Sequence, residues 1–600
     1  MNPLPPLCHR RLSALLACLL LTAIASKAAP VLNWSATVDS GAAASDRTKA
    51  LGVMTTGDVI AVSQIGSGTG AQIRVQRLAA STGSVVWTRD VGSAGFADDA
   101  TAITIVPASG DAYVAARAAT SANGLDWLVF KVSGTDGTLS WANNFTYTTA
   151  GNDEPRAITL MPDGNLAVAG METNPTSGQG RLRVTKIHAT TGLQIWNYTS
   201  PTDDTDALCV AADGAGNVIA AGRSGLDAYT VSLSNAGVLN WAQTYNGAGN
   251  GNDAWNAITV FSNGDMAVAG YLTGASGGQN FAVARYATAG GTPVWLREIN
   301  GTASASDAAF DVTNDGTDVI AAGLLRDATQ GQTACIAKLA GASGTVTWSN
   351  AVSGTGSARE ATHSFFAVRM LGTDIIAAGT QADATHQANI LISRYSNAGV
   401  LQESTVFDGT GHNDLLLSKS LLAVTGTSTF VVGGDSENAT AISNGAVFSY
   451  AHSAVDHWRL IALGSTTNTG NAADAADPNH NGISNLLEYA LNGDPLGTST
   501  RTSILPKASR SPTNHLQLTF ARYLDRTDLT LTIQASDTLS GGWTNLAQSV
   551  NAAPFTLLNG SASLAESGTG NSRSVSVGDI YLLSDPSHPR RFMRMNTTLP

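Results

Sequence analysis

The sequence predicts an all-β protein built from one repeated unit, and three observations support this prediction. Glycine accounts for 62 of 600 residues and charged residues for only 13%, which suits short strands joined by tight turns. A Thr-Gly turn followed by a short apolar run and a tryptophan recurs, as in "ASTGSVVWT" around Trp87 and "ATTGLQIWN" around Trp196. A second motif, such as "GNLAVAG" at Gly164, occurs eight times at spacings of 48 to 56 residues.

Each repeat contains four segments with strand character. In residues 98–145, "DDATAITIV" and "LDWLVFKVSG" alternate apolar and polar residues, "GDAYVAARA" follows a turn, and "GTLSWANNF" contains Trp141. Glycine with Asp or Asn marks each junction, as tight hairpins require. Four strands in roughly 53 residues are typical of a β-propeller blade, whereas β-helix coils are shorter and helical repeats have a 3.6-residue period. We therefore predict a β-propeller.

The two ends of the repeat array predict how the propeller closes. The tryptophan strand occurs first in "VLNWSA" around Trp34, before the first complete unit. The eighth unit, roughly residues 413–452, has its first three strands and then continues as "FSYAHSAVDHW", without the tryptophan element. We expect the N-terminal strand to complete the last blade, which gives eight blades. Seven blades are the alternative, because the eighth motif, "STFVVGG", is degenerate.

The repeated tryptophans are expected to be structural. Each lies on the outermost strand of its unit, where it can pack between neighbouring blades, and burial of one large aromatic side chain stabilises a fold by roughly 2–3 kcal/mol. Trp127, Trp255 and Trp458 fall outside the repeat register. We interpret those three as the better candidates for stacking on a sugar ligand.

The first 29 residues are predicted to be a secretory signal peptide. Arg10 and Arg11 precede an apolar run over residues 12–25, which is followed by small residues. Cleavage is expected near residues 25–28, and a lipoprotein site at Cys18 is the alternative. The apolar run is too short for a membrane span, and no later stretch approaches the roughly 20 residues that a span needs.

The mature chain is expected to be strongly acidic. Removal of residues 1–29 takes away three cations and no acids, so 33 Lys+Arg become 30 against 45 Asp+Glu, a net charge of −15. This charge disfavours nucleic acids and anionic membranes and is compatible with bound cations. Cys209 and Cys335 lie at non-equivalent positions in different repeats, so a disulfide between them is possible but not expected.

An acidic residue opens the predicted innermost strand of most units. Because innermost strands line a propeller channel, these side chains are expected to gather at one rim; they are Asp46, Asp99, Asp153, Asp206, Asp253, Asp307, Glu360 and Asp414. We favour a turn role, in which each carboxylate accepts from free backbone N–H groups, over a cation-binding or substrate-facing rim. Catalysis needs one asymmetric constellation, and His363, His386, His412 and His452 have no ligand spacing, so no catalytic residue is assigned.

The strongest chemical motif of the chain lies after residue 458. The segment from Asp477 to Glu488 has the spacing of a twelve-residue calcium loop, with Gly482 at the sharp turn. The predicted ligands are Asp477, Asn479, Asn481, the backbone carbonyl of Ile483, Asn485 at the position that often binds through water, and Glu488. An Asp- and Asn-rich turn is the alternative. With two acidic ligands, we expect weak affinity, near 10⁻⁴–10⁻³ M, as roughly observed for extracellular modules.

Residues after 500 are predicted to form a small β domain. "HLQLTF" and "DLTLTIQAS" alternate with period two, and "RRFMRMNTT" forms a last short strand. The predicted organisation is a signal peptide over residues 1–29, a propeller over 30–455, a linker with the calcium loop and a helix over 456–500, and a β-sandwich-like domain over 501–600.

The repeat motifs resemble known families. The Thr-Gly-x-x-x-Trp element resembles the tryptophan-docking motif of pyrroloquinoline quinone-type propellers, which are commonly eight-bladed, and the whole unit resembles secreted bacterial β-propeller repeats. The calcium loop resembles an EF-hand or dockerin half-site. The loop with "LEYAL" and the domain with "PRRF" resemble C-terminal modules of secreted proteins from Verrucomicrobia-like bacteria, which implies export. The adjacent cysteines and the haem motif common in quinoprotein dehydrogenases are absent from the sequence.

These observations predict a secreted or cell-surface bacterial protein that binds or adheres and is not an enzyme. Its tail is expected to be stabilised by calcium, its ligand to be a glycan or a protein on a propeller face, and its state to be monomeric. The first alternative is an extracellular hydrolase or lyase acting on polysaccharide. A quinoprotein dehydrogenase is a minor alternative.

Overall fold

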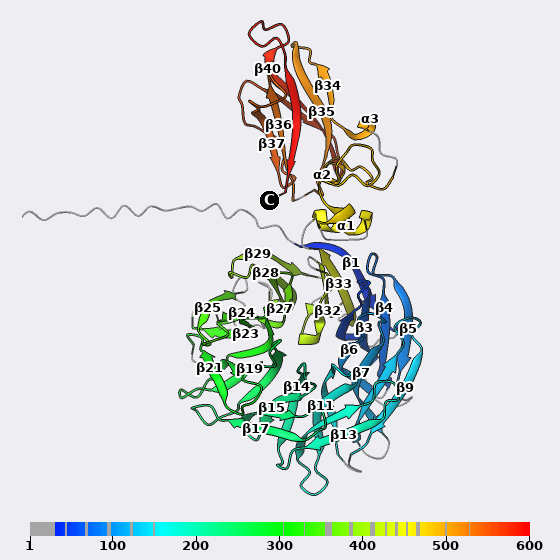
Figure 1. Ribbon diagram of the computed structural model, residues 1–600, viewed down its shortest axis with the longest axis vertical. Helices are drawn as coiled ribbons and strands as arrows, with labels where there is room; N and C mark the ends of the chain where they lie inside the picture. The colour runs from blue at the N-terminus through cyan, green and yellow to red at the C-terminus, as the bar shows by residue number, and fades with distance from the viewer. Residues whose placement is uncertain are drawn as a thin grey trace, which may run out of the picture.

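A computed structural model shows a ring of sheets with a smaller β domain beside it (Figure 1). It describes residues 30–599 except 42–44, 67–69, 93–97, 121–123, 148–150, 304, 329–330, 354–362, 383–387, 409–413, 427–428, 438–441, 452–453, 464–467, 498–500 and 527. Within these residues β1–β33 form eight antiparallel sheets and β34–β41 form two more. The chain is therefore an eight-bladed β-propeller followed by a β-sandwich, as the sequence predicted.

Blades 1 to 4 follow one another along the chain, each with four strands ordered from the channel outward. Blade 1 contains β2 (Arg47–Val53), β3 (Val59–Ile65), β4 (Gln72–Leu78) and β5 (Val85–Val91). Blade 2 contains β6 (Asp98–Ile105), β7 (Ala112–Thr120), β8 (Gly124–Val132) and β9 (Leu139–Phe145). Blade 3 contains β10 (Glu154–Leu160), β11 (Leu166–Thr173), β12 (Gly180–Ile187) and β13 (Gln194–Thr199). Blade 4 contains β14 (Thr205–Ala212), β15 (Val218–Ser224), β16 (Asp227–Leu233) and β17 (Leu239–Tyr245).

Blades 5 to 7 repeat this arrangement, and blade 8 departs from it. Blade 5 contains β18 (Ala254–Val260), β19 (Met266–Thr273), β20 (Gln279–Tyr286) and β21 (Pro293–Ile299). Blade 6 contains β22 (Ala308–Asn314), β23 (Val319–Asp327), β24 (Gly331–Leu339) and β25 (Val346–Val352). Blade 7 contains β26 (Ser364–Leu371), β27 (Asp374–Ala382), β28 (Ala388–Tyr395) and β29 (Leu401–Phe407). In blade 8 a short 3-10 helix, η2 (Lys419–Leu421), separates β30 (Asp414–Leu415) from β31 (Leu422–Val424), and β32 (Thr429–Glu437) and β33 (Ser443–Ala451) follow.

The N-terminal strand closes the ring. β1 (Val31–Val38) pairs antiparallel with β33, from Val31 opposite Ala451 to Val38 opposite Gly445, and so becomes the outermost strand of blade 8. The innermost strands of neighbouring blades contact one another around the ring, including β2 with β31. This arrangement confirms the predicted closure.

Burial along the strands follows their place in the blade. The second strand of blade 3, β11, is buried at almost every residue because the adjacent blades cover both of its faces. The outermost strand of blade 2, β9, alternates between exposed and partly buried residues, because only one of its faces is packed.

The repeated tryptophans connect blade 8 to blade 1 and each of blades 1 to 6 to the blade that follows it. The indole N–H of Trp295 in blade 5 donates to the carbonyl of Gly341 in blade 6 at 2.7 Å. The ring lies against Gly344 of the same turn. Equivalent bonds run from Trp34, Trp87, Trp141, Trp196, Trp241 and Trp348 to Ala80, Gly134, Ala189, Asn235, Thr288 and Asn397. Trp34 of blade 8 docks onto blade 1, so this contact also crosses the closure.

The C-terminal part begins with α1 (Ala454–Leu463) and continues through the 3-10 helix η3 (Gly470–Ala472), α2 (Asn485–Leu491) and α3 (Arg501–Ile504). Its sandwich has one sheet of β34 (Lys507–Arg510), β35 (His515–Tyr523), β40 (Ser572–Leu582) and β39 (Ser563–Ser567). The second sheet has β38 (Thr556–Leu557), β37 (Thr544–Val550), β36 (Thr530–Ser536) and β41 (Phe592–Thr598). One hydrophobic core joins both sheets to α1 and α2.

Candidate functional site

A β-bulge interrupts the innermost strand of seven blades. In each case one residue has no cross-strand partner, and the pairing register shifts around it. We call these seven residues the collar; they are Lys49, Thr101, Arg156, Leu208, Asn256, Phe310 and Phe366. Bulges re-aim side chains and are frequent beside functional sites. Because the innermost strands surround the channel, the collar marks its wall.

Collar residues reach from one blade to the next. Lys49 of blade 1 lies 3.0 Å from the carboxylate of Asp99 in blade 2. The amide of Asn256 in blade 5 donates to the carbonyl of Ala309 in blade 6 at 2.8 Å. The rings of Phe310 and Phe366, from blades 6 and 7, stack with centroids 4.9 Å apart.

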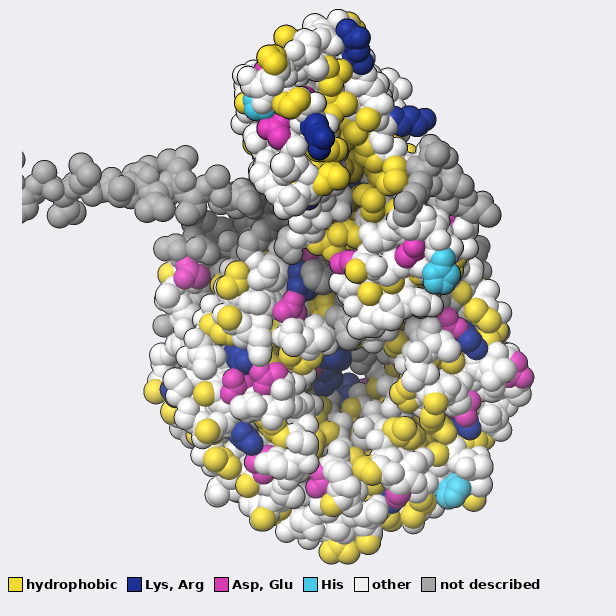
Figure 2. Space-filling view, turned by 45° about the horizontal axis from the view of Figure 1, so that its top comes forward, with side chains coloured by type: hydrophobic (Ala, Val, Ile, Leu, Met, Phe, Trp, Pro, Cys, Tyr) yellow, Lys and Arg dark blue, Asp and Glu magenta, His cyan; other side chains and the backbone are white. Residues whose placement is uncertain are grey.

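A series of charged side chains, the charge ladder, follows one arc of the channel, from blade 8 through blade 4. In order its members are Asp435, Arg47, Lys49, Asp99, Arg117, Glu154, Arg156, Asp206 and Arg223. Asp435 pairs with Arg47, and an unbroken series of pairs connects Lys49 to Asp206; the N···O distances are 2.8 to 3.7 Å. Arg223 follows because its charge acts on Asp206. The ladder therefore has five cations against four anions. Lys and Arg side chains are visible within the central opening of the ring (Figure 2).

Two ladder carboxyls have raised pKa values. Burial raises the pKa of Asp206 to about 6, against the opposing charges of Arg156 and Arg223. Burial also raises the pKa of Asp435 to about 7, although Arg47 and Lys49 favour its charged form. Carboxyl groups that titrate near neutrality inside a concave surface are typical of functional sites, although structural ion pairs can show the same shifts.

Lys419 of η2 crosses the channel from blade 8 to the opposite side. Its ammonium donates to the carbonyl oxygens of Leu208, at 3.4 Å, and of Asn256, which are collar residues of blades 4 and 5. Backbone groups at a bulge do not take part in strand pairing, so the carbonyl oxygens of Leu208 and Asn256 are available as acceptors. The η2 backbone is held in turn by Arg369, which donates to the Lys419 carbonyl at 2.8 Å. Lys419 is thus a fixed strut that divides the charged arc from the Phe310–Phe366 arc.

The aspartates that precede the bulges by three residues bind backbone. In blade 5, Asp253 accepts from the N–H groups of Gly247 and Thr273, both at 2.5 Å. In blade 6, Asp307 accepts from Gly301 and Arg326, both at 2.6 Å. Asp46 and Asp153 accept equivalent bonds. Each carboxylate therefore connects the end of the preceding segment to the second strand of its own blade.

The eight predicted rim acids do not occupy one position. Asp46, Asp153, Asp253 and Asp307 lie three residues before a bulge, and Asp414 opens β30. Asp99 and Asp206 come one residue later in the register and belong to the charge ladder; Asp98 and Thr205 take the backbone-binding position in their blades. Glu360 lies outside the described residues, as do His386, His412 and His452.

His363 takes the equivalent position in blade 7. It lies three residues before Phe366, is buried, and its Nδ1 accepts the backbone N–H of Ala382 at 3.1 Å. His363 belongs with the aspartates because it, too, lies three residues before a collar residue. The sequence motifs did not reveal this role.

Other sequence candidates belong to the core. Trp127 and Trp255, proposed as sugar-stacking residues, are fully buried, so they are unable to meet a ligand. Trp458 packs against Tyr489 in the core of the C-terminal part. Cys209 and Cys335 are free, buried thiols in blades 4 and 6, and burial raises the pKa of Cys209 to about 11 and that of Cys335 to about 12.

The predicted calcium loop folds around its own side chains. The carboxylate of Asp477 accepts the N–H groups of Asn481 at 3.1 Å and Gly482 at 2.7 Å, and Asn481 accepts from Ile483 at 2.8 Å. Glu488, in α2, accepts from the Asn481 amide at 2.7 Å. The amide of Asn485 instead donates to the carbonyls of Asn471 and Ala473, so this side chain anchors α2 to η3.

The loop has an unsatisfied acceptor suited to a cation. Glu488 is 1% exposed, and its Oε2 has no hydrogen-bond partner among the described residues. Burial, together with the charges of Asp494 and Asp477, raises the pKa of Glu488. In the described parts of the chain, no three His, Cys, Asp or Glu side chains could hold a metal by themselves. A cation here would thus depend on amide and backbone oxygens too, and hard oxygen ligands of this kind fit calcium.

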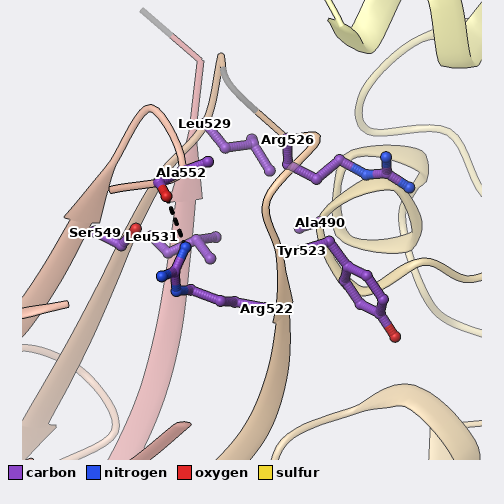
Figure 3. Close-up of a pocket in the computed structure, with 8 residues that line it drawn as sticks. All are labelled: Ala490, Arg522, Tyr523, Arg526, Leu529, Leu531, Ser549 and Ala552. Atoms are coloured by element: carbon purple, nitrogen blue, oxygen red, sulfur yellow. Dashed lines mark hydrogen bonds between the residues drawn. The ribbon is translucent and has the colours of Figure 1, made fainter. Parts of the chain in front are cut away.

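A small hollow lies where α2 meets the sandwich, and it is nearly filled. Its volume is about 10 Å³, enough for at most one water molecule. Figure 3 shows Arg522 pointing across it to the carbonyl of Ala552, at 2.7 Å. Arg522 also pairs with Glu566, and Arg526 donates to the carbonyl of Tyr489 at 2.7 Å. The Arg526 bond attaches α2 to the sandwich, and the Arg522 contacts hold the sandwich side of the hollow.

Comparisons with known proteins find the fold and no closer relationship. No protein-family model and no curated protein matches the chain. Sqt1 from Chaetomium thermophilum, solved with the N-terminus of ribosomal protein L10, is 13% identical and covers 70% of this chain and 100% of its own, with a TM-score of 0.44. Quinohemoprotein alcohol dehydrogenase from Comamonas testosteroni is 11% identical over 70% of this chain and 76% of its own, with a TM-score of 0.39.

The WD40 domain of SCAP from fission yeast is 9% identical over 68% of this chain and 96% of its own, with a TM-score of 0.40. Such similarities are too low to support an argument about ligands or activity. Within the described residues, no helix has the length and apolar character of a membrane span. The eight sheets and the closed ring that they form identify the architecture: the chain is an eight-bladed β-propeller protein with a C-terminal β-sandwich.

Proposed function

We propose that the protein is an exported binding protein whose ligand is received at the propeller channel. The carrying observation is the contrast between two sets of residues at repeated positions. The docking tryptophans and the backbone-binding aspartates recur from blade to blade, as a scaffold requires. The collar position recurs, but its residue type does not: the seven side chains include charged, polar, aliphatic and aromatic ones. An asymmetric lining inside a symmetric ring is what recognition of one ligand needs.

The proposed ligand is a glycan or a protein segment, and the protein is proposed to act as a monomer outside the cell. The mature chain would be screened on a glycan array and against extracellular proteins. Phe310→Ala and Arg156→Gln change the two arcs of the collar, and Leu193→Ser, directly before the outer strand β13 and 65% exposed, is the control. We expect a ligand whose binding is lost in the collar variants and kept in the control. Ligands that bind all variants equally would contradict a channel site.

We further propose that calcium orders the segment between propeller and sandwich. The support is that Asn481 contacts the carboxylates of both Asp477 and Glu488, and that one Glu488 oxygen is unpartnered. Bound calcium would supply a positive charge there, while Gly482, at φ +78°, allows the loop its sharp turn. α2 then transmits this order to the sandwich through Arg526.

An extracellular hydrolase or lyase is the second candidate, favoured by the raised pKa values of Asp206 and Asp435. Release of reducing ends from a polysaccharide panel would reveal such an activity. A catalytic role requires that Asp206→Asn or Asp435→Asn abolish it without loss of the fold. Activity that survives both substitutions would exclude these two carboxyls as the acid or base.

A further inference from the structure

A pocket of about 170 Å³ opens beside the Lys419 strut, where blades 8, 1 and 2 meet. Its lining has two parts. The polar part has the charged residues Arg47, Lys49 and Asp435, and the apolar part includes Leu415, Leu417 and Leu421. Complete ligand pockets are commonly about 300–1,000 Å³, so this one is sized for a small molecule.

Arg47 is the most exposed cation of the pocket lining, and its ion pair is long. Within the described residues it has one ion-pair partner, Asp435, whose carboxylate oxygen is 3.7 Å from its Nε. The next cation, Lys49, contacts both carboxylate oxygens of Asp99 at 3.0 and 3.3 Å. The Arg47 side chain is 51% exposed, so its guanidinium can offer a fork of N–H donors to a molecule in the pocket.

Asp435 determines how positive the pocket is. It is largely buried, and one of its oxygens has no hydrogen-bond partner in the described structure. Because burial raises its pKa to about 7, the charged form is lost as the pH falls through neutrality. The charges that face it are Arg47 and Lys49, with Asp99 beyond Lys49. Below pH 7 the group is neutral and the positive charge of Arg47 is unopposed.

The apolar wall is held in place rather than left mobile. Leu417 is 52% exposed, so its side chain is available to a molecule in the pocket. It lies two residues before Lys419, whose ammonium is bonded to Leu208 and Asn256 across the channel. Ser418 caps η2 by accepting the Ser420 N–H at 3.2 Å. An apolar ligand group would therefore meet a preformed surface.

We propose that this pocket binds a small organic carboxylate with an apolar group beside it. The carboxylate pairs with the guanidinium of Arg47, and the apolar group packs on Leu417. Charge complementarity supports an anion here, because two cations, Arg47 and Lys49, line the pocket against one acid, Asp435, although the chain as a whole has a net charge of −12. The inference rests on the proposed function, because it names a ligand class for the same channel.

The test uses the mature chain and isothermal titration with 4-methylpentanoate, and with 4-methylpentanamide as a neutral probe of the same shape. We expect the acid to bind and the amide to bind at least tenfold more weakly. Arg47→Gln and Leu417→Asp should each weaken acid binding at least tenfold. Arg510→Gln, an exposed arginine on β34 of the sandwich, is the matched control and should leave binding unchanged.

The pH dependence separates a carboxylate site from a purely apolar one. Binding of the acid should weaken between pH 6 and pH 8 in the native protein, because Asp435 becomes charged beside the ligand. Asp435→Asn should bind equally at both values. Equal binding of acid and amide, or acid binding that Arg47→Gln leaves intact, would overturn the inference. If a collar-dependent ligand is found and no acid competes with it, the inference fails while the proposed function stands; if no ligand depends on the collar, the function fails.

Discussion

At the residue scale, the docking tryptophans and the glycines opposite them form a single device. In blades 1 to 7 the glycine-containing turn before the outermost strand receives the tryptophan ring of the preceding blade, so the two halves of the motif act in different interfaces. At Gly344 a Cβ atom would lie 2.5 Å from the ring of Trp295. The residue also has φ +67°, a conformation that strains any side chain. The glycine is therefore required by both backbone and ring.

A pair of substitutions can separate those two requirements. Gly344→Ala should lower the free energy of unfolding by roughly 2–4 kcal/mol, from about 1–2 kcal/mol of left-handed backbone strain plus the collision with Trp295. Gly164→Ala provides the control, since that glycine has φ +79° and open space around it. It should show the backbone strain alone. Chemical denaturation measures both, and equal losses would show that the ring contact adds nothing.

Residues that recur could be predicted from the sequence, whereas residues that depend on strand register could not. The tryptophans and several backbone-binding aspartates could be predicted because they recur at equivalent positions of successive repeats. The bulge residues, such as Arg156 and Phe366, follow from an offset between two paired strands, and neither strand shows that offset by itself. Asp99 and Asp206 were therefore grouped with the capping acids, although they lie one position further along and bind arginine.

At the element scale, α2 and the loop before it form the connection between ring and sandwich. The twelve-residue spacing predicted both the turn at Gly482 and the helix that presents Glu488, and both are present. The helix ends at Asn492, which has φ 56°. The interruption of the innermost strand of blade 8 by η2 was not predicted, because its leucine-rich sequence suits a continuous strand equally well.

Calcium should stabilise this connection in a way that depends on one carboxylate. Titration of the mature chain with calcium should raise the melting temperature of the C-terminal transition, because the ion binds the folded loop and not the unfolded one. Glu488→Gln keeps the shape of the side chain but removes its charge, and it should abolish the shift. Differential scanning calorimetry checks this. Asp408→Asn, an exposed acid after β29, should respond like the native chain. A full calcium response in Glu488→Gln would refute the site.

At the scale of the whole molecule, the closure of the ring determines its stability. Every blade interface is buried only while both neighbours are present, and β1 supplies the outer strand that blade 8 lacks. The strut from η2 to blades 4 and 5 adds a contact across the centre, so the ring is braced across its diameter as well as around its circumference.

Deletion of residues 31–38 should destabilise the propeller strongly. The unpaired edge of β33 and the uncovered side of blade 1 would be exposed, including the contact of Trp34 with Gly83. Thermal melting and binding of a hydrophobic dye are the measurements. Trp34→Ala removes the docking contact but keeps the strand, and it should cost only about 3–5 kcal/mol, as core Trp→Ala substitutions do. A deletion with native melting behaviour would show that β1 is dispensable.

The pairing of β1 with β33 also fixes the order in which the molecule can be completed. Val31 is opposite Ala451, 420 positions later in the chain, so the strand synthesised first waits for almost the whole propeller before it finds its partner. Contacts of such long sequence separation form slowly, and unpaired strand edges favour aggregation meanwhile. Any nascent or truncated chain that stops before residue 443 therefore lacks the partner of β1 and is an open ring. The ring closes only after β33 has been synthesised.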